Sequence, residues 1–533
     1  MNQPSLDPRT PVVVGVGQAS ERLDAQAYRK RSPVDLAADA AREALADTGA
    51  DPAAVAAAID TVVGVRQFEN SVPGARAPLG RSDNYPRSVA GRIAASPARA
   101  VLEVSGGQAP QHLVNEFAAV IADGGSQVTL LFGSEAISTI VHLAQADSKP
   151  DFTEHAAGSL EDRGYGLSGM MSRHLAAHGL TGAPSQYALI DNARRARLKQ
   201  TRQEYAAAMG ALFAPFSEVA AANPHAAAPV QRSAAELVTP TEANRPIADP
   251  YTRYIVAREK VNQGAAVLLT SVSAARRLGI PQERWVFLHG HADLRERDLL
   301  DRADLSAGPA SVMAVRHALD QAGIGAEELT TIDLYSCFPA PVFNICDGLG
   351  LDPEDPRGLT VTGGLPFFGG PGNNYSMHAI AETIQRARSA PGSYGLVGAN
   401  GGIMSKYSAG VYCTAAAWRP DRGAGLQAEI DGWPAPEQAH YADGPATIET
   451  YTVRHARDGA RTGIVVGRLD AAGSRFVAKG DDPDLLDLLT AAKEPIGQPV
   501  YVRSFGAGNR VTSTRARMDE LFPPGLTPPA GRP

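Results

Sequence analysis

The sequence has few cysteines, no long apolar runs and no excess of positive charge. Its 533 residues include only three cysteines, Cys337, Cys346 and Cys413, and their spacing is that of neither metal ligands nor a C-x-x-C pair. So few cysteines indicate a reducing compartment, and we expect a cytoplasmic protein. No apolar run approaches the roughly 20 residues of a membrane helix, and the polar start Met1–Thr10 does not resemble a signal peptide.

The charge balance excludes one further class of protein. There are 50 basic and 57 acidic residues, which gives a net charge of −7. A general electrostatic attraction to nucleic acid or anionic lipid is therefore not expected. Apolar residues make up 44% of the chain, enough for a large core. The length predicts about three or four domains.

Strand-like and helix-like segments alternate in the first part of the chain. Pro11–Gly17 is a β-rich run that ends in glycine, as a buried strand does. Ser32–Gly49 has apolar residues at helical spacing, with Ser32 as N-cap and a proline in the first turn. Thr61–Val65 and Gln127–Phe132 are again strand-like. Strands joined by helices predict a parallel α/β sheet.

This pattern returns late in the chain. Ala44–Gly49 (ALADTG) is similar to Ala318–Gly323 (ALDQAG), and an Ile-Asp pair followed by a strand-like run comes after each, at 59–60 and 332–333. We infer an internal duplication. The segment between the halves is Ala-rich and helical, and long excursions of this kind are usually functional.

Past Trp418 the pattern changes to short alternating runs such as Thr447–Val453, which predict a small antiparallel, OB-like β-barrel. The expected domains are an N-terminal half (1–136 and 247–290), an inserted loop domain (137–246), a C-terminal half (291–418), the barrel (426–521) and a disordered tail (522–533).

Several short stretches resemble motifs of the thiolase superfamily, in the order in which that family carries them. They are Ser105-Gly106, Gly133–Ser138, Asn223–Ala226, Arg245–Pro250, Asn262–Ala266, Tyr335–Phe338, Gly363-Gly364 and Gly369–Pro371. With the appended barrel, the chain most resembles the thiolase-like proteins of type 1, which are similar to sterol-carrier-protein-2 thiolases. The resemblance implies two βαβαβαββ halves in αβαβα layers, acyl-CoA as the class of ligand, and a dimer by family habit unless the barrel covers that surface.

The same resemblance implies that the thiolase catalytic groups are missing. The position of the nucleophilic cysteine falls on Glu103, that of the activating histidine on Gly370, and that of the acid/base cysteine on Ala399. The fourth position, usually Asn or His, falls on Tyr335. Thiolysis and Claisen condensation require a thiolate and a nearby imidazole. We therefore expect a protein of lipid metabolism that binds CoA or acyl-CoA without the thiolase reaction.

Three residues are candidates for altered chemistry. Glu103 could be the base of an acyltransferase or decarboxylase, or a carboxylate that caps a helix N-terminus. Cys337 could be a new nucleophile or a buried thiol. His378 could be a displaced base or a core histidine. A further alternative is a scaffold whose partner enzyme supplies the reaction.

Other side chains have possible binding roles. Arg194, Arg195 and Arg197 could contact the phosphates of CoA, or could belong to a solvated helix face. His289 and His291 lie on one side of a strand-like run, but no further ligands can be identified, so we predict no metal site. The barrel could cover the body or recruit a partner protein, and nucleic acid is not an expected partner.

Overall fold

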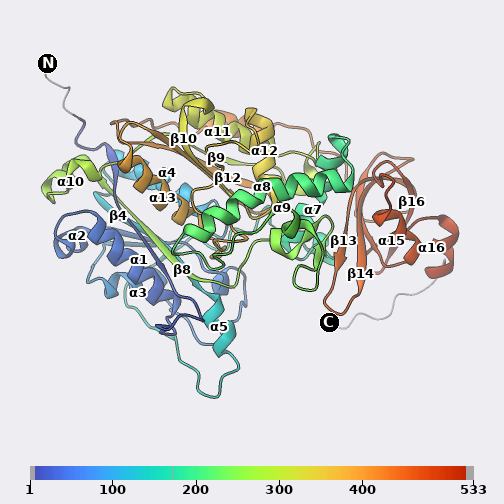
Figure 1. The fold of residues 1–533 in the computed structure, drawn as a ribbon, viewed down its shortest axis with the longest axis horizontal. Coiled ribbons are helices and arrows are strands. Elements are labelled where there is room, and N and C mark those ends of the chain that lie inside the picture. Colours follow the sequence, from blue (N-terminus) through green and yellow to red (C-terminus); the bar gives the residue numbers. More distant parts are fainter. Residues whose placement is uncertain (1–5, 171, 524–533) are drawn as a thin grey trace.

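The computed structural model describes residues 6–170 and 172–523, which form a layered body with a barrel at one end (Figure 1). The first sheet has the strand order β1-β8-β4-β2-β3-β5, and the second has the order β10-β11-β12-β9. Their bounds are β1 Pro11–Ser20, β2 Thr61–Gly64, β3 Arg99–Leu102, β4 Val128–Ala136, β5 Glu161–Asp162, β8 Asn262–Ser271, β9 Phe287–Arg295, β10 Leu329–Leu334, β11 Tyr394–Gly401 and β12 Lys406–Cys413.

The body has five layers. Helices α4 (Ala109–Ala122) and α13 (Tyr375–Ser389) lie between the two sheets and pack on both. The outer face of the first sheet is covered by α1 (Pro33–Asp47) together with α2 (Pro52–Ala58), α3 (Tyr85–Arg92) and α10 (Val272–Arg277). The outer face of the second sheet is covered by α11 (Pro309–Ala322) and α12 (Pro339–Leu349). The predicted αβαβα arrangement is confirmed.

The first long helix begins where its capping residues predict. The Ser32 hydroxyl accepts a hydrogen bond from the Asp35 N–H, and the Asp35 carboxylate accepts one from the Ser32 N–H, both at 3.1 Å. This reciprocal capping box satisfies two N–H groups that the helix leaves free. The apolar face of α1 is buried against β1 and β8.

The two halves repeat one topology. The order β1-β8-β4-β2 in the first sheet matches β9-β12-β11-β10 in the second, with two antiparallel pairs followed by one parallel pair in each. Strand β9 crosses the domain boundary predicted between residues 290 and 291. At the position next to β10, where the first half has β3, the second half has a loop. The Asp333 carboxylate fixes this loop by accepting hydrogen bonds from the N–H groups of Val361 and Thr362, at 2.9 and 3.2 Å.

The insertion between the halves is mostly helical. It contains α5 (Ile137–Leu143), α6 (Arg173–Ala177), α7 (Ala183–Arg197), α8 (Arg202–Ala222) and α9 (Ala234–Val238). Within the described residues, α8 is the one helix long and apolar enough to cross a membrane, and it packs here on α9 and α12. Strand β5 also belongs to the insertion and pairs with β3 at the sheet edge.

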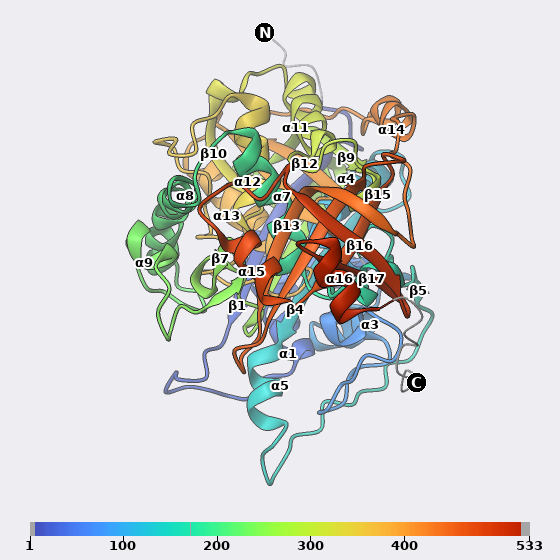
Figure 2. The ribbon, with the colours of Figure 1, turned by 90° about the vertical axis from the view of Figure 1, so that its right-hand side faces the viewer.

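The C-terminal domain is a closed five-stranded barrel (Figure 2). Its strands follow the order β13-β14-β15-β17-β16 and return to β13. They span β13 Gly444–His455, β14 Arg461–Leu469, β15 Arg475–Gly480, β16 Pro499–Phe505 and β17 Gly508–Thr512, and α15 (Pro483–Thr490) and α16 (Arg515–Leu521) pack on them. Helix α14 (Ala424–Asp431) precedes the barrel and packs on β9 of the body.

Two details of the predicted barrel need correction. The β15–β17 pair is parallel, because α15 carries the chain across the barrel before β16 begins. Strands β6 (Pro246–Ala248) and β7 (Tyr251–Thr252) join the barrel sheet through β13, although the sequence placed 247–290 in the N-terminal half. The predicted tail 522–533 lies, apart from Phe522 and Pro523, outside the described residues.

Buried polar contacts fix the barrel on the body. The Arg475 guanidinium donates to the backbone oxygens of Leu300 and Arg302. The Thr450 hydroxyl donates to Leu189 O at 2.6 Å, and the N–H of Asn509 donates to His178 Nε2 at 2.7 Å. Such contacts are costly to leave unmade when buried, so they specify one docking geometry.

Candidate functional site

Glu103 lies directly after β3 and shortly before α4, at the carboxyl end of a parallel strand. Its side chain is only 2% exposed, and Arg163 Nη1 donates to its Oε2 at 2.7 Å. The guanidinium supplies an opposite charge for this buried carboxylate. Glu103 is therefore held by an arginine of the inserted segment, whereas the sequence predicted an interaction with the helix end.

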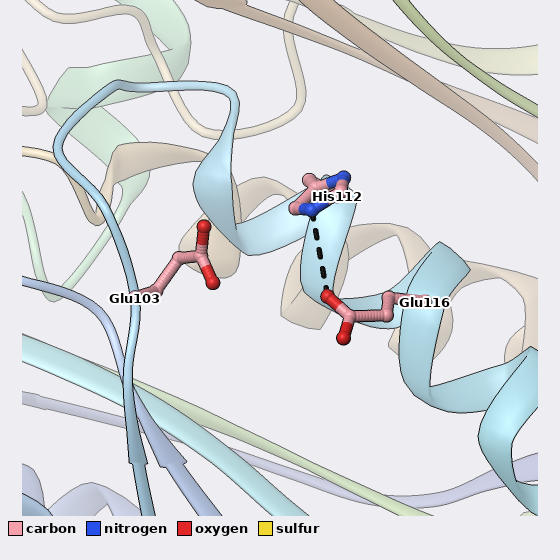
Figure 3. Close-up of side chains that lie close together, drawn as sticks. All are labelled: Glu103, His112 and Glu116. Atoms are coloured by element: carbon pink, nitrogen blue, oxygen red, sulfur yellow. Dashed lines mark ion pairs between the residues drawn. The ribbon is translucent and has the colours of Figure 1, made fainter. Parts of the chain in front are cut away.

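Sequence reasoning missed the partners of Glu103 on α4. His112 and Glu116 are one turn apart on this helix, on the side to which Glu103 points (Figure 3). Arg163 also donates to both carboxylate oxygens of Glu116 at 2.7 Å, and Asp293 Oδ1 lies 3.2 Å from His112 Nδ1. The i, i+4 spacing of His112 and Glu116 was the available sequence signal.

Electrostatics decides what this cluster can bind. Ligand atoms of Glu103, His112 and Glu116 lie within 4.8 Å of one another, as in a metal site. Arg163, however, already supplies the cation that the two carboxylates share. Asp293, Glu103 and Glu116 together raise the pKa of His112 to about 9 despite its burial. In this structure the cluster is thus a charge network in which His112 and Arg163 face three carboxylates.

Gly107, Tyr187, Tyr335, Cys337 and Asn400 form a packed group, which we call the central cluster. A Cβ on Gly107 would collide with Tyr335 Oη and lie 2.5 Å from Asn400 O. Asn400 Nδ2 donates to Tyr187 Oη at 2.8 Å and lies 3.9 Å from Cys337 Sγ. Burial raises the pKa of Cys337 to about 12. Ala399, which precedes Asn400 on β11, is fully buried.

The remaining predicted catalytic positions, Gly370 and His378, have contacts of their own. Gly370 contributes only backbone, and its N–H donates to Arg258 O at 2.8 Å. His378 is a buried residue of α13 whose Nδ1 lies 2.7 Å from Gln18 Oε1, with its ring against Phe368. Burial lowers the pKa of His378 well below its usual value, which keeps the imidazole neutral. The contacts of His378 are those of a core histidine.

The arginines predicted to contact CoA are engaged within the chain. Arg194 and Arg195 are 6% and 2% exposed. Arg194 Nη2 lies 2.7 Å from Asp347 Oδ1, Arg195 Nη1 lies 2.6 Å from Glu494 Oε2, and Arg197 shares Asp347 at 2.9 Å. A phosphate would have to compete with these carboxylates, so the geometry favours a structural role for the three arginines.

The pair His289 and His291 has no metal-site geometry. Each Nε2 lies 2.6 Å from a backbone oxygen, of Ala415 and Arg419 respectively, and the His291 ring stacks on Trp418. Both rings thus anchor the segment that leaves the body toward the barrel.

A cavity of about 490 Å³ opens beside the Glu103 network, within the size range of small-molecule sites. Five parts of the chain form its wall: the β3–α4 loop with the first turn of α4, residues 166–169 of the insertion, the end of β9, the start of β12 and the segment around α14. The charged residues in this wall are Glu103, His112, Asp293, Arg295, Glu296, Asp298, Lys406 and Arg422. We call it the charged cavity.

Comparison with protein families identifies the C-terminal domain. Residues 425–507 match the family described as the thiolase-like protein type 1 additional C-terminal domain. No match is found among curated proteins.

One of the solved structures that match covers nearly the whole chain. The chain is 51% identical to a monomeric SCP2-thiolase-like protein type 1 from Mycobacterium smegmatis, with a TM-score of 0.83, over 96% of this chain and 100% of that one. A thiolase fold alone is shared with two distant structures. One is the acetyl-CoA acetyltransferase of Syntrophomonas wolfei, with 14% identity and a TM-score of 0.52 over 76% of this chain and 99% of that one. The other is the dimeric peroxisomal thiolase of Saccharomyces cerevisiae, with 15% identity and a TM-score of 0.54 over 76% of this chain and 98% of that one.

Proposed function

Because the chain belongs to the SCP2-thiolase-like proteins of type 1, we propose that it binds CoA or acyl-CoA in lipid metabolism without thiolysis or Claisen condensation. The observation that carries this proposal is the state of the central cluster. A thiolase fold surrounds it, but its one thiol is buried and strongly protonated.

Thiolase chemistry needs a thiolate beside an imidazole. No hydrogen bond between a cysteine and a histidine occurs in residues 6–170 and 172–523, where all the cysteines and histidines of the chain lie. A pKa of about 12 leaves only about one in 10,000 to 100,000 Cys337 thiols ionised near neutral pH. These observations support the loss of the reaction at Glu103, Tyr335, Gly370 and Ala399.

An alternative is an acyltransferase or decarboxylase that uses Glu103. One observation favours it: Glu103 lies in the wall of the charged cavity, where its carboxylate could face a ligand. Against it, the Arg163 guanidinium already occupies this carboxylate, so a ligand proton would have to compete with the ion pair.

Calorimetric titration of the whole protein with CoA and with acetyl-CoA tests the proposal. We expect heat of binding for at least one ligand and no thioester turnover above the uncatalysed rate. Absence of heat for both would contradict ligand binding and favour the scaffold alternative.

Glu103→Gln tests the enzymatic alternative. Turnover in the native protein that the substitution abolishes would assign catalysis to Glu103 and overturn the proposal. Glu161→Gln is the matched control, because Glu161 also pairs with Arg163 but lies at the exposed sheet edge outside the cavity wall.

For the barrel we propose a role in covering the body, with recruitment of a partner protein as the alternative. The covering role is supported by the buried contacts of Arg475 and Thr450 with the body. One distant fold neighbour is named as the Ltp2-ChsH2(DUF35) aldolase (18% identity, TM-score 0.54, 76% of this chain and 98% of that one). Strand β5 occupies the free edge of β3, which supports a monomer over a dimer joined at that edge.

A further inference from the structure

The charged cavity contains a buried ammonium group without an acidic partner. Lys406 begins β12 and is 9% exposed. Its Nζ donates to Ser105 O at 3.2 Å and to Gly166 O, and no carboxylate of the described residues lies within ion-pair distance of it. An ammonium has three N–H donors, so one remains after these two bonds. A buried charge without a counter-ion is costly.

Three of the four carboxylates in the cavity wall already have hydrogen-bond or ion-pair partners within the chain. Glu103 is paired with Arg163. The Asp293 carboxylate accepts from Ser408 Oγ at 2.7 Å and neighbours His112. Glu296 accepts from two backbone N–H groups, at 2.9 and 3.1 Å. Asp298 is the fourth, and it lies at the exposed rim.

The cations of the wall are less well compensated. Among the described residues, the Arg295 side chain has no hydrogen bond or ion pair. Arg422 approaches Asp293 only at 3.8 Å, beyond hydrogen-bonding distance. Burial first, and then the neighbouring Arg295, lower the pKa of Lys406, while the Glu103 carboxylate acts in the opposite direction. Within the described residues, the Lys406 ammonium and the Arg295 guanidinium of this wall therefore have no carboxylate within ion-pair distance.

We propose that the charged cavity is a binding site for an organic anion, whose carboxylate or phosphate accepts the third N–H of Lys406 and lies between Arg295 and Arg422. This site goes beyond the proposed function, because its anion-binding groups, Lys406, Arg295 and Arg422, are not among the residues to which that function is assigned. One of its walls is formed by Arg422, Ala424 and Gln427, at the start of the appended domain. The ligand thus bridges the thiolase-like body and the first helix of that domain.

Reductive labelling with pyridoxal 5′-phosphate tests the site in the intact protein. The lysine amine condenses with the aldehyde of this probe and releases water, and borohydride then reduces the imine to a stable amine. We expect peptide mass mapping to show Lys406 labelled at least about fivefold faster than the exposed Lys260, because the phosphate is attracted to the cavity. Inorganic phosphate and succinate, as competitors, are expected to slow it.

Three controls make the result decisive. Pyridoxal, which lacks the phosphate, is expected to label Lys406 poorly. Arg295→Gln and Arg422→Gln are each expected to slow the labelling of Lys406, whereas Arg277→Gln, at an exposed site outside the cavity wall, is not. Equal labelling by the two probes, equal labelling of Lys406 and Lys260, or no effect of either arginine substitution would overturn the proposal.

A competition arm with CoA separates this proposal from the proposed function. If CoA competes as inorganic phosphate does, the anion of the cavity is a CoA phosphate. If phosphate competes and CoA does not, the cavity binds a different organic anion. The calorimetric titration alone then tests whether the protein binds CoA.

Discussion

The central cluster and the charged cavity lie on neighbouring parts of the same β3–α4 loop, yet they are built from opposite chemistry. Tyr335, Cys337 and Asn400 fill the first with neutral, closely packed groups. Glu103, His112 and Lys406 make the second a network of charges around open space. Within one thiolase-like fold, neighbouring segments thus form a closely packed neutral cluster and an open cavity lined by charges.

The largest expected contrast concerns thiol reactivity in the central cluster. Because burial raises the pKa of Cys337 to about 12, the thiolate fraction at pH 8 is lower than for an ordinary thiol by roughly 1,000-fold. We expect alkylation of native Cys337 by iodoacetamide to be slower by about that factor than after denaturation. Mass spectrometry of the labelled peptides measures both rates. Rapid alkylation in the native protein would show that the cluster retains a nucleophile.

Removing the cation of the charge network comes next in size. Arg163→Met leaves Glu103 and Glu116 without their shared partner, and an uncompensated buried charge costs about 3–5 kcal/mol. We expect the free energy of unfolding in urea to fall by about that amount. Adding Glu103→Gln to Arg163→Met is expected to restore part of it. If Arg163→Met and the double variant had the same free energy of unfolding, the unpaired Glu103 carboxylate would not be the cause of the lost stability.

Packing of the central cluster predicts a smaller effect. Gly107→Ala places a methyl group against Tyr335 Oη and Asn400 O, and overpacking of this kind costs about 1–3 kcal/mol. Gly425→Ala is the matched control, since nothing lies within 4 Å of its Cβ and α14 gains a better helix former. Denaturation midpoints of both variants measure the difference. An unchanged midpoint for Gly107→Ala would mean that the cluster has free space.

The smallest effect on stability separates two histidines. The His112 pKa is raised to about 9, so its contribution is complete below pH 6.5 and is lost as the pH rises through 9. His112 is 29% exposed on its side chain, and we expect a loss of about 1–2 kcal/mol. His378, whose pKa is lowered, stays neutral over that range. NMR titration of the two rings measures this, and a His112 pKa near 6.5 would contradict the charge network.

The sequence predicted the architecture better than the site. The capped helix after Ser32, the duplicated halves and the barrel all follow from local patterns that recur along the chain. The parallel β15–β17 pair could not be predicted from such patterns. The direction of the strands that close the barrel depends on where α15 crosses it. Arg194 and Arg195 were predicted to be available for phosphate, but their partners Asp347 and Glu494 lie 153 and 299 residues away in the chain.

By itself, the sequence determined which groups are present, with a net excess of acid, and its resemblance to thiolases predicted a carboxylate, a glycine, an alanine and a phenol at the four catalytic positions. Only the tertiary structure decided which of these groups meet. It brought Arg163 to Glu103 and Glu116, and it left Lys406 without an acidic partner. The physical reason is that backbone patterns act between near neighbours, whereas the state of a charge depends on its burial and on every charge nearby, whatever their separation in the chain.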